Sequence, residues 1–335
     1  MFKTLAAILV LSVSAANAAP PAPITIVIHG GAGALERGRY SPEQEAAFKS
    51  KLAEALKSGY SVLESGGEAV DAVEAAILLM EDSPLFNAGK GAVFDAAGVN
   101  ELDAAIMDGK NEQAGAVAGV THVKNPIKLA RAVMDHSRHV MMIGHGAEKF
   151  AKEQDIELVK RSYFFTEERW QAYKKAKNKE KAEKNNDART SLNFDSKYGT
   201  VGAVALDRNG NIAAGTSTGG LTLKRYGRVG DSPIIGAGTY ASNRSCGVSA
   251  TGTGEYFIRF TIARDICAEV EFNGRTAGEA ANKLIHETLA NAGGDGGVIV
   301  LTPLGDYAFD FNTAGMFRGV KNDGIEMVAI YGDEN

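Results

Sequence analysis

The segment that most constrains the fold is a short run of β-branched residues near the start of the chain, at positions 24–28. Its sequence, Ile-Thr-Ile-Val-Ile, is nearly unbroken, which is typical of a strand buried on both faces. Similar runs recur at residues 201–206 and 212–215, on either side of the dipeptide Asn209-Gly210. Asn-Gly is a strong hairpin turn signal. The chain is therefore expected to contain largely antiparallel sheets.

Apolar residues at helical spacing separate these strands. The spacing predicts helices over residues 42–64, 69–80, 126–134, 255–270 and 277–290. Short strands are predicted over residues 92–94, 101–107, 114–120, 248–251, 297–302 and 307–312. Strands and helices in both halves indicate a layered α/β protein.

The first residues have the order of a secretory signal peptide. Lys3 precedes an apolar run over residues 5–13, and small residues follow, ending in Ala16-Asn17-Ala18. The run is shorter than the roughly 20 apolar residues that a membrane span needs. The sequence predicts a signal peptide over residues 1–18, cleavage near Ala18, and export, most simply to a periplasm.

Composition argues against several kinds of partner. The net charge of -5 comes with no basic patch of the kind that binds nucleic acid, and no later segment resembles a membrane span. None of the six histidines stands in a metal-ligand motif. One Gly-x-Ser-x-Gly match, at residues 215–219, lacks the strand-turn-helix context of a nucleophile elbow and is interpreted as chance.

Two features leave alternatives open. The Lys-rich stretch over about residues 174–198 is interpreted as a solvated, disordered linker, although a surface loop or the tail of a polar helix would have the same composition. Cys246 and Cys267 are interpreted as buried free thiols. A disulfide is the alternative, because the predicted strand with Cys246 and the predicted helix with Cys267 extend from the same turn.

A candidate nucleophile follows the linker directly. Thr200 begins the strand predicted at residues 201–206 and is preceded by Gly199. A threonine hydroxyl needs an adjacent base, and an N-terminal α-amino group with a pKa of about 7.7 to 8.0 can serve as one. Gly199 permits a strained turn that brings the Thr200 hydroxyl to the preceding carbonyl. Alone, this segment would be interpreted as an ordinary strand start.

Three neighbouring segments favour the catalytic interpretation. Residues 216–220 return hydroxyl groups to the same end of the sheet as Thr200. Residues 251–255 join a strand to a helix, where free backbone N–H groups favour an oxyanion. Arg228 and Asp231 lie three residues apart in a Gly-rich loop, where they can form an internal salt bridge or hold the α-carboxylate and α-amino groups of an amino acid.

Together these segments resemble the plant-type L-asparaginase and isoaspartyl peptidase family of N-terminal nucleophile hydrolases. The likeness runs from about residue 24 to 318. The matching motifs are His29-Gly30-Gly31-Ala32-Gly33, Pro84-Leu85-Phe86-Asn87-Ala88-Gly89, Met107-Asp108-Gly109, Gly199-Thr200-Val201-Gly202-Ala203-Val204-Ala205, and the segments 227–233 and 251–255.

The resemblance implies an α+β fold, an αββα four-layer sandwich. It also implies that residues 19–335 form a single catalytic domain, cleaved between Gly199 and Thr200 into an α chain (19–199) and a β chain (200–335). Two such pairs would assemble as an (αβ)2 oligomer.

Residue roles are also implied by the resemblance. Thr200 would be the nucleophile, supported by Thr218, Thr251, Gly252 and Asn87, with Thr251 and Gly252 lining an oxyanion hole. Arg228, Asp231 and Gly254 would bind the substrate's aspartyl end together with Thr251 and Gly252. No organic cofactor is implied. A structural sodium ion is implied in the loop that includes Met80, Glu81, Ser83, Phe86, Ala88 and Lys90, although Lys90 replaces a commonly uncharged residue.

The function implied is hydrolysis of the side-chain amide of L-asparagine and of β-aspartyl dipeptides, with release of L-aspartate. Glycosylasparaginase and a non-catalytic aspartate-binding protein are the alternatives. The balance between asparagine and isoaspartyl peptides stays open, because both substrates present the same aspartyl end to Arg228 and Asp231.

Overall fold

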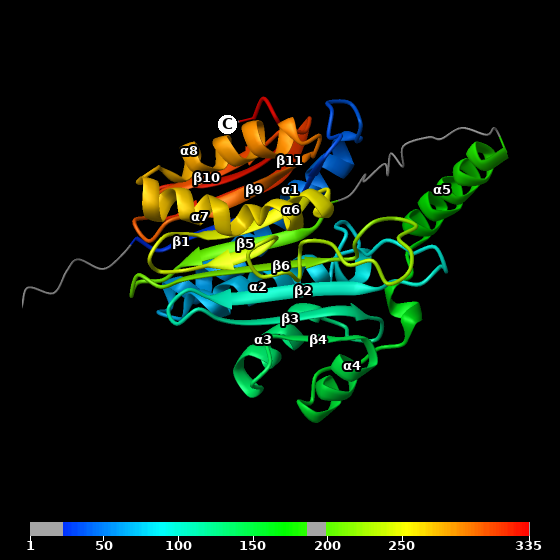
Figure 1. Cartoon of the computed structure of the whole chain (residues 1–335), viewed down its shortest axis with the longest axis horizontal. Coiled ribbons are helices and arrows are strands. Elements are labelled where there is room, and N and C mark those ends of the chain that lie inside the picture. The colour runs from blue at the N-terminus through cyan, green and yellow to red at the C-terminus, as the bar shows by residue number, and fades with distance from the viewer. Residues whose placement is uncertain (1–22, 186–198, 335) are drawn as a thin grey trace, which may run out of the picture.

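A computed structural model describes residues 23–185 and 199–334 (Figure 1). The proposed signal peptide lies outside these residues, as do residues 186–198. An eight-stranded sheet has the order β12-β11-β1-β5-β6-β2-β3-β4, and a four-stranded sheet has the order β10-β9-β8-β7. Neighbouring strands are antiparallel except for the pair β3 and β4.

The strands of the larger sheet are β1 (Thr25–Gly33), β2 (Leu102–Asp108), β3 (Gln113–Val120), β4 (Met141–Ile143), β5 (Val201–Leu206), β6 (Ile212–Thr218), β11 (Gly315–Asn322) and β12 (Glu326–Tyr331). Those of the smaller sheet are β7 (Thr239–Ala241), β8 (Gly247–Gly252), β9 (Gly296–Leu301) and β10 (Tyr307–Phe311).

The helices are α1 (Pro42–Glu64), α2 (Ala69–Glu81), α3 (Pro126–His136), α4 (Gly144–Glu153), α5 (Glu167–Asn185), α6 (Gly254–Phe260), α7 (Ile262–Asn273) and α8 (Ala277–Asn282). A π-helical segment, Lys283–Leu289, continues α8. Two 3₁₀ turns occupy Gly89–Gly91 and Arg161–Phe164.

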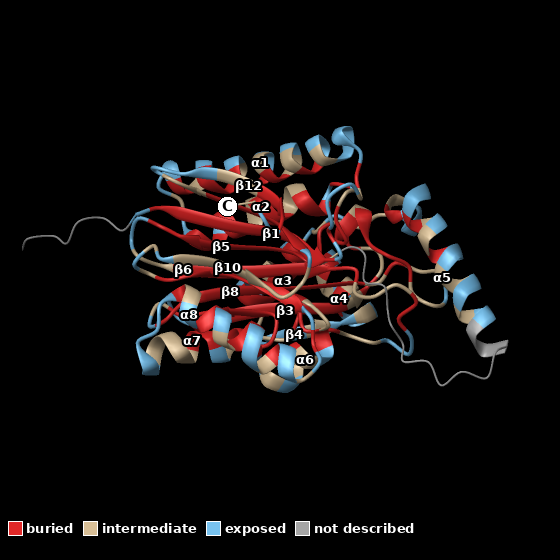
Figure 2. Cartoon of the chain, turned by 90° about the horizontal axis from the view of Figure 1, so that it is seen from above, coloured by how far each residue is buried: buried red, intermediate tan, exposed pale blue. Residues whose placement is uncertain are grey.

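The central strands are buried on both faces, as the sequence predicts. In β1, Ile26 and Ile28 belong to the core shared with α1, α2 and α3, whereas Val27 belongs to the core that includes the smaller sheet, α7 and α8. Adjacent strand residues point to opposite faces, so one strand contributes to two cores. The outer helices are exposed on their far sides (Figure 2). The predicted αββα sandwich is confirmed.

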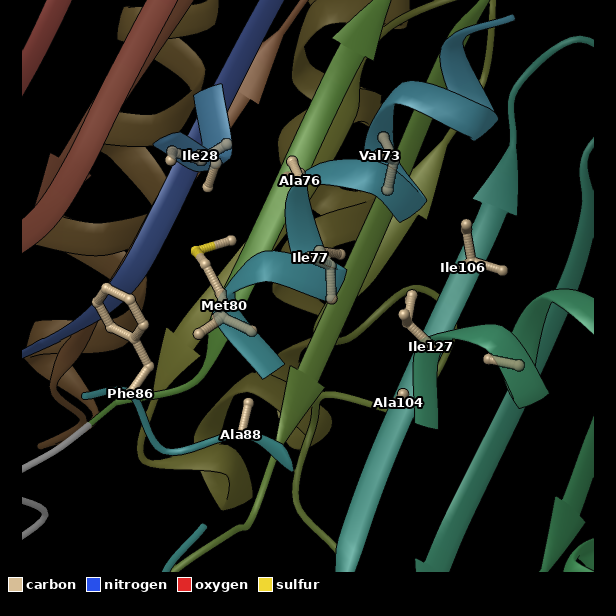
Figure 3. Packing of buried hydrophobic residues seen from close by; sticks show 14 of the residues in the cluster. Ile28, Val73, Ala76, Ile77, Met80, Phe86, Ala88, Ala104, Ile106 and Ile127 are labelled. Atoms are coloured by element: carbon tan, nitrogen blue, oxygen red, sulfur yellow. The ribbon is translucent and has the colours of Figure 1, made fainter. Parts of the chain in front are cut away.

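Helix α2 packs over the strands of the larger sheet in the first core. Figure 3 shows Val73, Ile77 and Met80 on α2 directed towards Ile28 and Ile106 of the sheet. Phe86 and Ala88, in the loop after α2, point into the same core. The loop is therefore held in place by its side chains, which leaves its backbone to face other groups.

Several predicted boundaries are correct and others are wrong. Helix α1 matches residues 42–64, and its Ser41 and Gln44 form a capping box at the N-terminus. The helix predicted over residues 255–270 is interrupted at Thr261, whose φ of 48° places it in the left-handed region. Residues 92–94 form no strand, because the Asn100 side-chain amide donates to the carbonyls of Ala92 and Val93.

The disordered linker predicted over residues 174–198 is wrong in its first part, because α5 extends to Asn185. Arg169 and Tyr173 on α5 are buried, whereas Lys174, Lys175 and Lys181 are exposed. The lysines therefore form the solvated face of a docked helix. The alternative of a polar helix was the correct one over this part.

The interpretation of Cys246 and Cys267 as free thiols is also wrong. The two form a disulfide across a Cα–Cα distance of 5.3 Å. Helix α7 packs on β8, and this packing brings Cys267 within the separation that a disulfide requires. Among the described residues, no helix is both long enough and apolar enough to cross a membrane.

Candidate active site

The candidate nucleophile lies where strand ends from both sheets meet. In the β5–β6 ladder Val201 is opposite Ser217, so Thr200, one residue earlier, lies beside Thr218 at the end of β6. Thr251, near the end of β8, reaches the same place from the smaller sheet. The cavity there is lined by Asn87, Gly199, Thr200, Thr218, Arg228, Asp231, Thr251 and Gly252, among others. These predicted residues are therefore brought together.

The two threonine hydroxyls are in contact. Thr200 Oγ1 donates to Thr218 Oγ1 at 3.0 Å, and both residues are buried. Thr218 Oγ1 also accepts from the backbone N–H of Gly220 at 3.0 Å. The second bond fixes the Thr218 hydroxyl, which in turn holds the Thr200 hydroxyl in one orientation. A nucleophile fixed in this way is chemically preorganised.

The Gly199–Thr200 bond is enclosed by glycine backbone. Gly31 has a φ of 109°, and a Cβ there would lie 2.3 Å from the Cα of Gly199. A Cβ on Gly199 would in turn lie 2.7 Å from Thr251 Oγ1. Only glycines permit this approach. The position of the His-Gly-Gly motif against the proposed scissile bond therefore requires glycine at Gly31 and at Gly199.

Asn87 contacts the backbone that follows Thr218. Its side-chain amide donates to the carbonyl of Gly220 at 2.8 Å, and its Oδ1 accepts from Val93 N at 3.0 Å. The Asn87 carbonyl accepts from Gly219 N at 3.0 Å. Asn87 therefore lines the cavity and also fixes the turn that carries the Thr218 hydroxyl.

Arg228 and Asp231 flank the other side of the cavity, but they do not form the simple ion pair considered from the sequence. Arg228 Nε and Nη2 each donate to one carboxylate oxygen of Glu255 at 2.9 Å. Glu255 does not line the cavity, whereas Arg228 does. The glutamate therefore binds one edge of the guanidinium from outside the cavity lining. Sequence reasoning missed this role because 27 residues separate the pair.

Asp231 is almost fully buried, and its Oδ2 accepts no hydrogen bond among the described residues. Burial raises the pKa of the Asp231 carboxyl to about 7, against the opposing effect of the nearby Arg228. Gly254 permits the arrangement, because a Cβ there would lie 2.7 Å from Asp231 Oδ1 and 3.0 Å from Arg228 Nη2. A buried carboxylate of this kind is suited to an ammonium ligand.

His29 lies outside the cavity lining. Its Nε2 is 2.9 Å from Ser249 Oγ, which in turn is 2.6 Å from Thr216 Oγ1. Burial lowers the pKa of the His29 imidazole to about 3, so the ring is neutral at physiological pH. These contacts give His29 a structural role. The Gly-x-Ser-x-Gly match lies within and just after β6 and leads into no helix.

The loop of the implied sodium ion presents backbone carbonyls. A Cβ on Gly91 would lie 2.0 Å from the carbonyl oxygen of Phe86, and one on Gly89 would lie 2.3 Å from that of Glu81. The Lys90 ammonium lies 5.3 Å from the centre of the Tyr163 ring. No group of three or more His, Cys, Asp or Glu side chains suited to a metal ion occurs among the described residues. Carbonyl oxygens of this kind would suit a hard cation such as sodium, whereas thiolate and imidazole ligands would suit a transition metal.

The fold and the threonine at the start of a central strand define the class: the chain is built as an N-terminal nucleophile hydrolase. The sequence pattern of the family described as asparaginase matches residues 22–330, and the chain belongs to this family.

Curated relatives are similar to this chain over most of their lengths. The chain is 49% identical to an isoaspartyl peptidase of Escherichia coli K12, covering 88% of this chain and 91% of the relative. It is 46% identical to a putative isoaspartyl peptidase/L-asparaginase of Dictyostelium discoideum, covering 88% and 92%. The human isoaspartyl peptidase/L-asparaginase is 40% identical, with 90% and 94% covered.

The raised pKa of Asp231 generates a prediction about stability. The folded protein retains a proton on this carboxyl up to pH about 7, whereas the unfolded chain releases it near the usual pKa of about 3.9. The contribution to folding is therefore complete below pH about 4 and is lost as pH rises towards 7. We expect Asp231→Asn to remove this loss and to raise the melting temperature at pH 7.5 more than at pH 5.

Thermal unfolding of the ligand-free protein and the variant at both pH values measures the effect. A melting-temperature difference that is the same at pH 5 and pH 7.5 would show that the buried carboxyl does not titrate between them.

Proposed function

We propose that this protein is an isoaspartyl peptidase and L-asparaginase that hydrolyses the side-chain amide of L-asparagine and of β-aspartyl dipeptides, releasing L-aspartate. The observation that carries the proposal is the contact of Thr200 Oγ1 with Thr218 Oγ1, in a cavity that Arg228 and Asp231 also line. The proposed nucleophile and the two side chains proposed to bind the substrate's α-carboxylate and α-ammonium groups thus line one cavity. The names of the relatives support the same activity.

The first proposed step is self-cleavage. Thr200 Oγ1 attacks the carbonyl carbon of Gly199 and its proton passes to the Thr200 nitrogen. The C–N bond to Thr200 breaks, and the Gly199 acyl group is left on Oγ1 as an ester. Water then hydrolyses the ester. The products are an α chain ending at Gly199 and a β chain whose free α-amino group is that of Thr200.

The second proposed step is substrate hydrolysis. The neutral α-amino group of Thr200 takes the hydroxyl proton while Oγ1 attacks the substrate's side-chain carbonyl carbon. The oxyanion is stabilised by hydrogen-bond donors beside it, for which Thr251 and Gly252 are the candidates because both line the cavity. The proton passes to the leaving amine, and water then releases aspartate from the Thr200 ester.

Arg228 and Asp231 are proposed to bind the aspartyl end. The guanidinium edge that Glu255 leaves free can take the α-carboxylate of the substrate. The ionised Asp231 carboxylate can take the α-ammonium group, and Gly254 leaves room for both side chains. Recognition of both charged groups favours a substrate with a free aspartyl end over a peptide with an internal asparagine.

Glycosylasparaginase and a non-catalytic aspartate-binding protein remain the alternatives, and no observation on the described residues favours either. Turnover of L-asparagine, β-Asp-Leu and a glycosylated asparagine by the purified protein separates the three. Release of aspartate only from the glycosylated substrate would support glycosylasparaginase, and release from none would support a binding protein.

The proposal includes a structural sodium ion held by backbone carbonyls of the loop that contains Glu81, Phe86 and Lys90. The supporting observation is that the carbonyl oxygens of Glu81 and Phe86 lie against Gly89 and Gly91 in this loop. No catalytic step passes through the ion. We expect the melting temperature to fall when sodium chloride is replaced by tetramethylammonium chloride at equal ionic strength, and an unchanged value would contradict the site.

Export to the periplasm and an (αβ)2 assembly complete the proposal. The disulfide between Cys246 and Cys267 suits an oxidising compartment. An N-terminus at Ala19 in protein from its native cells would support export, and one at Met1 would contradict it. Light scattering would support the assembly with twice the mass of one αβ pair, whereas the mass of a single pair would contradict it.

The self-cleavage step predicts that Thr200→Ala remains a single chain without amidase activity, because it lacks the hydroxyl that attacks Gly199. The wild-type protein should separate on denaturing electrophoresis into two chains, with Thr200 as the new N-terminus. Thr288→Ala, in the helical layer on the smaller sheet, serves as a matched control and should cleave normally. Full cleavage or full activity of Thr200→Ala would refute the mechanism.

A further inference from the structure

We infer that helix α5 is a positioning element for the nucleophile, and that Arg169 on this helix is the positioning residue. The inference rests on the proposed function, because it concerns the same cavity. It assigns a role to the last described helix before the proposed cleavage point, whose lysines alone indicate a linker, a surface loop or the tail of a polar helix.

Arg169 is an unusual residue for such a charged helix, because its residue surface is only 3% exposed. Its Nε donates to the carbonyl of Gly91 at 2.7 Å, and its Nη2 donates to the carbonyl of Leu85 at 3.2 Å. These two carbonyls lie on either side of Asn87 in the chain. One guanidinium therefore joins the two ends of the loop that carries Asn87.

A continuous set of hydrogen bonds leads from this loop to the nucleophile. Asn87 accepts from Gly219 N through its backbone and donates to the Gly220 carbonyl through its side chain. Gly220 N donates to Thr218 Oγ1, which accepts from Thr200 Oγ1. A shift of the Asn87 loop would therefore be transmitted to the turn that orients the Thr200 hydroxyl.

Aromatic packing fixes α5 to the same loop. The rings of Trp170 and Tyr173 stack at 4.9 Å, and Trp170 packs edge-on against Phe94 at 5.2 Å. Phe94 accepts a backbone hydrogen bond from Leu223 N at 2.9 Å. Thus α5 contacts the loop from Leu85 to Phe94 directly and, through Phe94, the segment that leads to Arg228.

A second contact reaches that segment directly. Glu180 lies seven residues after Tyr173 on α5 and forms an ion pair with Arg225. Arg225 in turn accepts from Arg228 N through its carbonyl, at 2.9 Å. Both walls of the cavity, the one with Asn87 and the one with Arg228, are therefore held by a single helix.

The shape of α5 argues that these contacts do more than complete the core. Figure 1 shows the helix projecting from the body of the protein, and its buried residues form one narrow seam that includes Arg169 and Tyr173. After cleavage at Gly199, α5 is no longer joined covalently to Thr200. Non-covalent contacts of this kind then connect α5 to the surroundings of Thr200.

The test compares Arg169→Met and Arg169→Lys with the wild-type protein, using Lys181→Gln on the exposed face of α5 as the matched control. We expect Arg169→Met to lower kcat for L-asparagine about tenfold, which corresponds to about 1.4 kcal/mol, because the Asn87 loop loses its two bonds to the guanidinium. Arg169 does not line the cavity. KM should stay within about twofold, since the lost bonds orient the nucleophile rather than bind substrate. Arg169→Lys should recover part of kcat, because lysine retains the charge but cannot bridge two carbonyls.

Hydrogen exchange gives a readout that does not depend on catalysis. The amides of Gly219 and Gly220 bond to Asn87 and Thr218, so both should exchange faster in Arg169→Met than in wild type or Lys181→Gln. If the wild-type protein hydrolyses no amide, the proposed function fails, but the exchange result still tests the positioning role.

Two results would overturn the inference. One is a folded Arg169→Met protein with wild-type kcat and unchanged exchange at Gly219 and Gly220. The other is a loss of kcat that equals the loss in Lys181→Gln, because that would show an effect of α5 charge rather than of the buried guanidinium.

Discussion

The pairing of β5 with β6 is the interaction on which the rest of the site depends. Its register places Thr200 beside Thr218, and the packing of the two sheets brings Thr251 of β8 to the same point. A one-residue slip of β5 would turn every side chain of the strand to its other face. That slip is opposed on both sides, because Ala203 packs into one core and Val204 into the other. The cores therefore fix the position of Thr200, the proposed nucleophile.

Close backbone contact supplies the second constraint. Gly31 and Gly199 approach so closely that a side chain on either would overlap the other. Charge supplies the third, because burial raises the pKa of the Asp231 carboxyl to about 7 and so makes its ionised form unfavourable without a cationic partner. The buried carboxyl costs stability in the free protein as the pH rises towards 7. Such costs at a site, rather than at random positions, are typical of residues arranged for function.

Much of this arrangement could be predicted from local patterns. The capping residues of α1 and the unbroken apolar run of β5 define their own boundaries, and Thr200, Arg228 and Asp231 stand in recognisable motifs. What could not be predicted depends on tertiary packing. The left-handed Thr261 has no sequence signal, and the seam of α5 is hidden by its lysines. Cys246–Cys267 and Arg228–Glu255 are joined only because separate elements pack together.

The central claim is that the Thr200 hydroxyl forms a covalent bond to the substrate. The most direct measurement is mass spectrometry of the β chain after rapid acid quenching during turnover of L-asparagine. We expect an aspartyl ester on the N-terminal peptide of the β chain, at Thr200. An aspartyl adduct on another residue, with an unmodified Thr200 peptide, would contradict it.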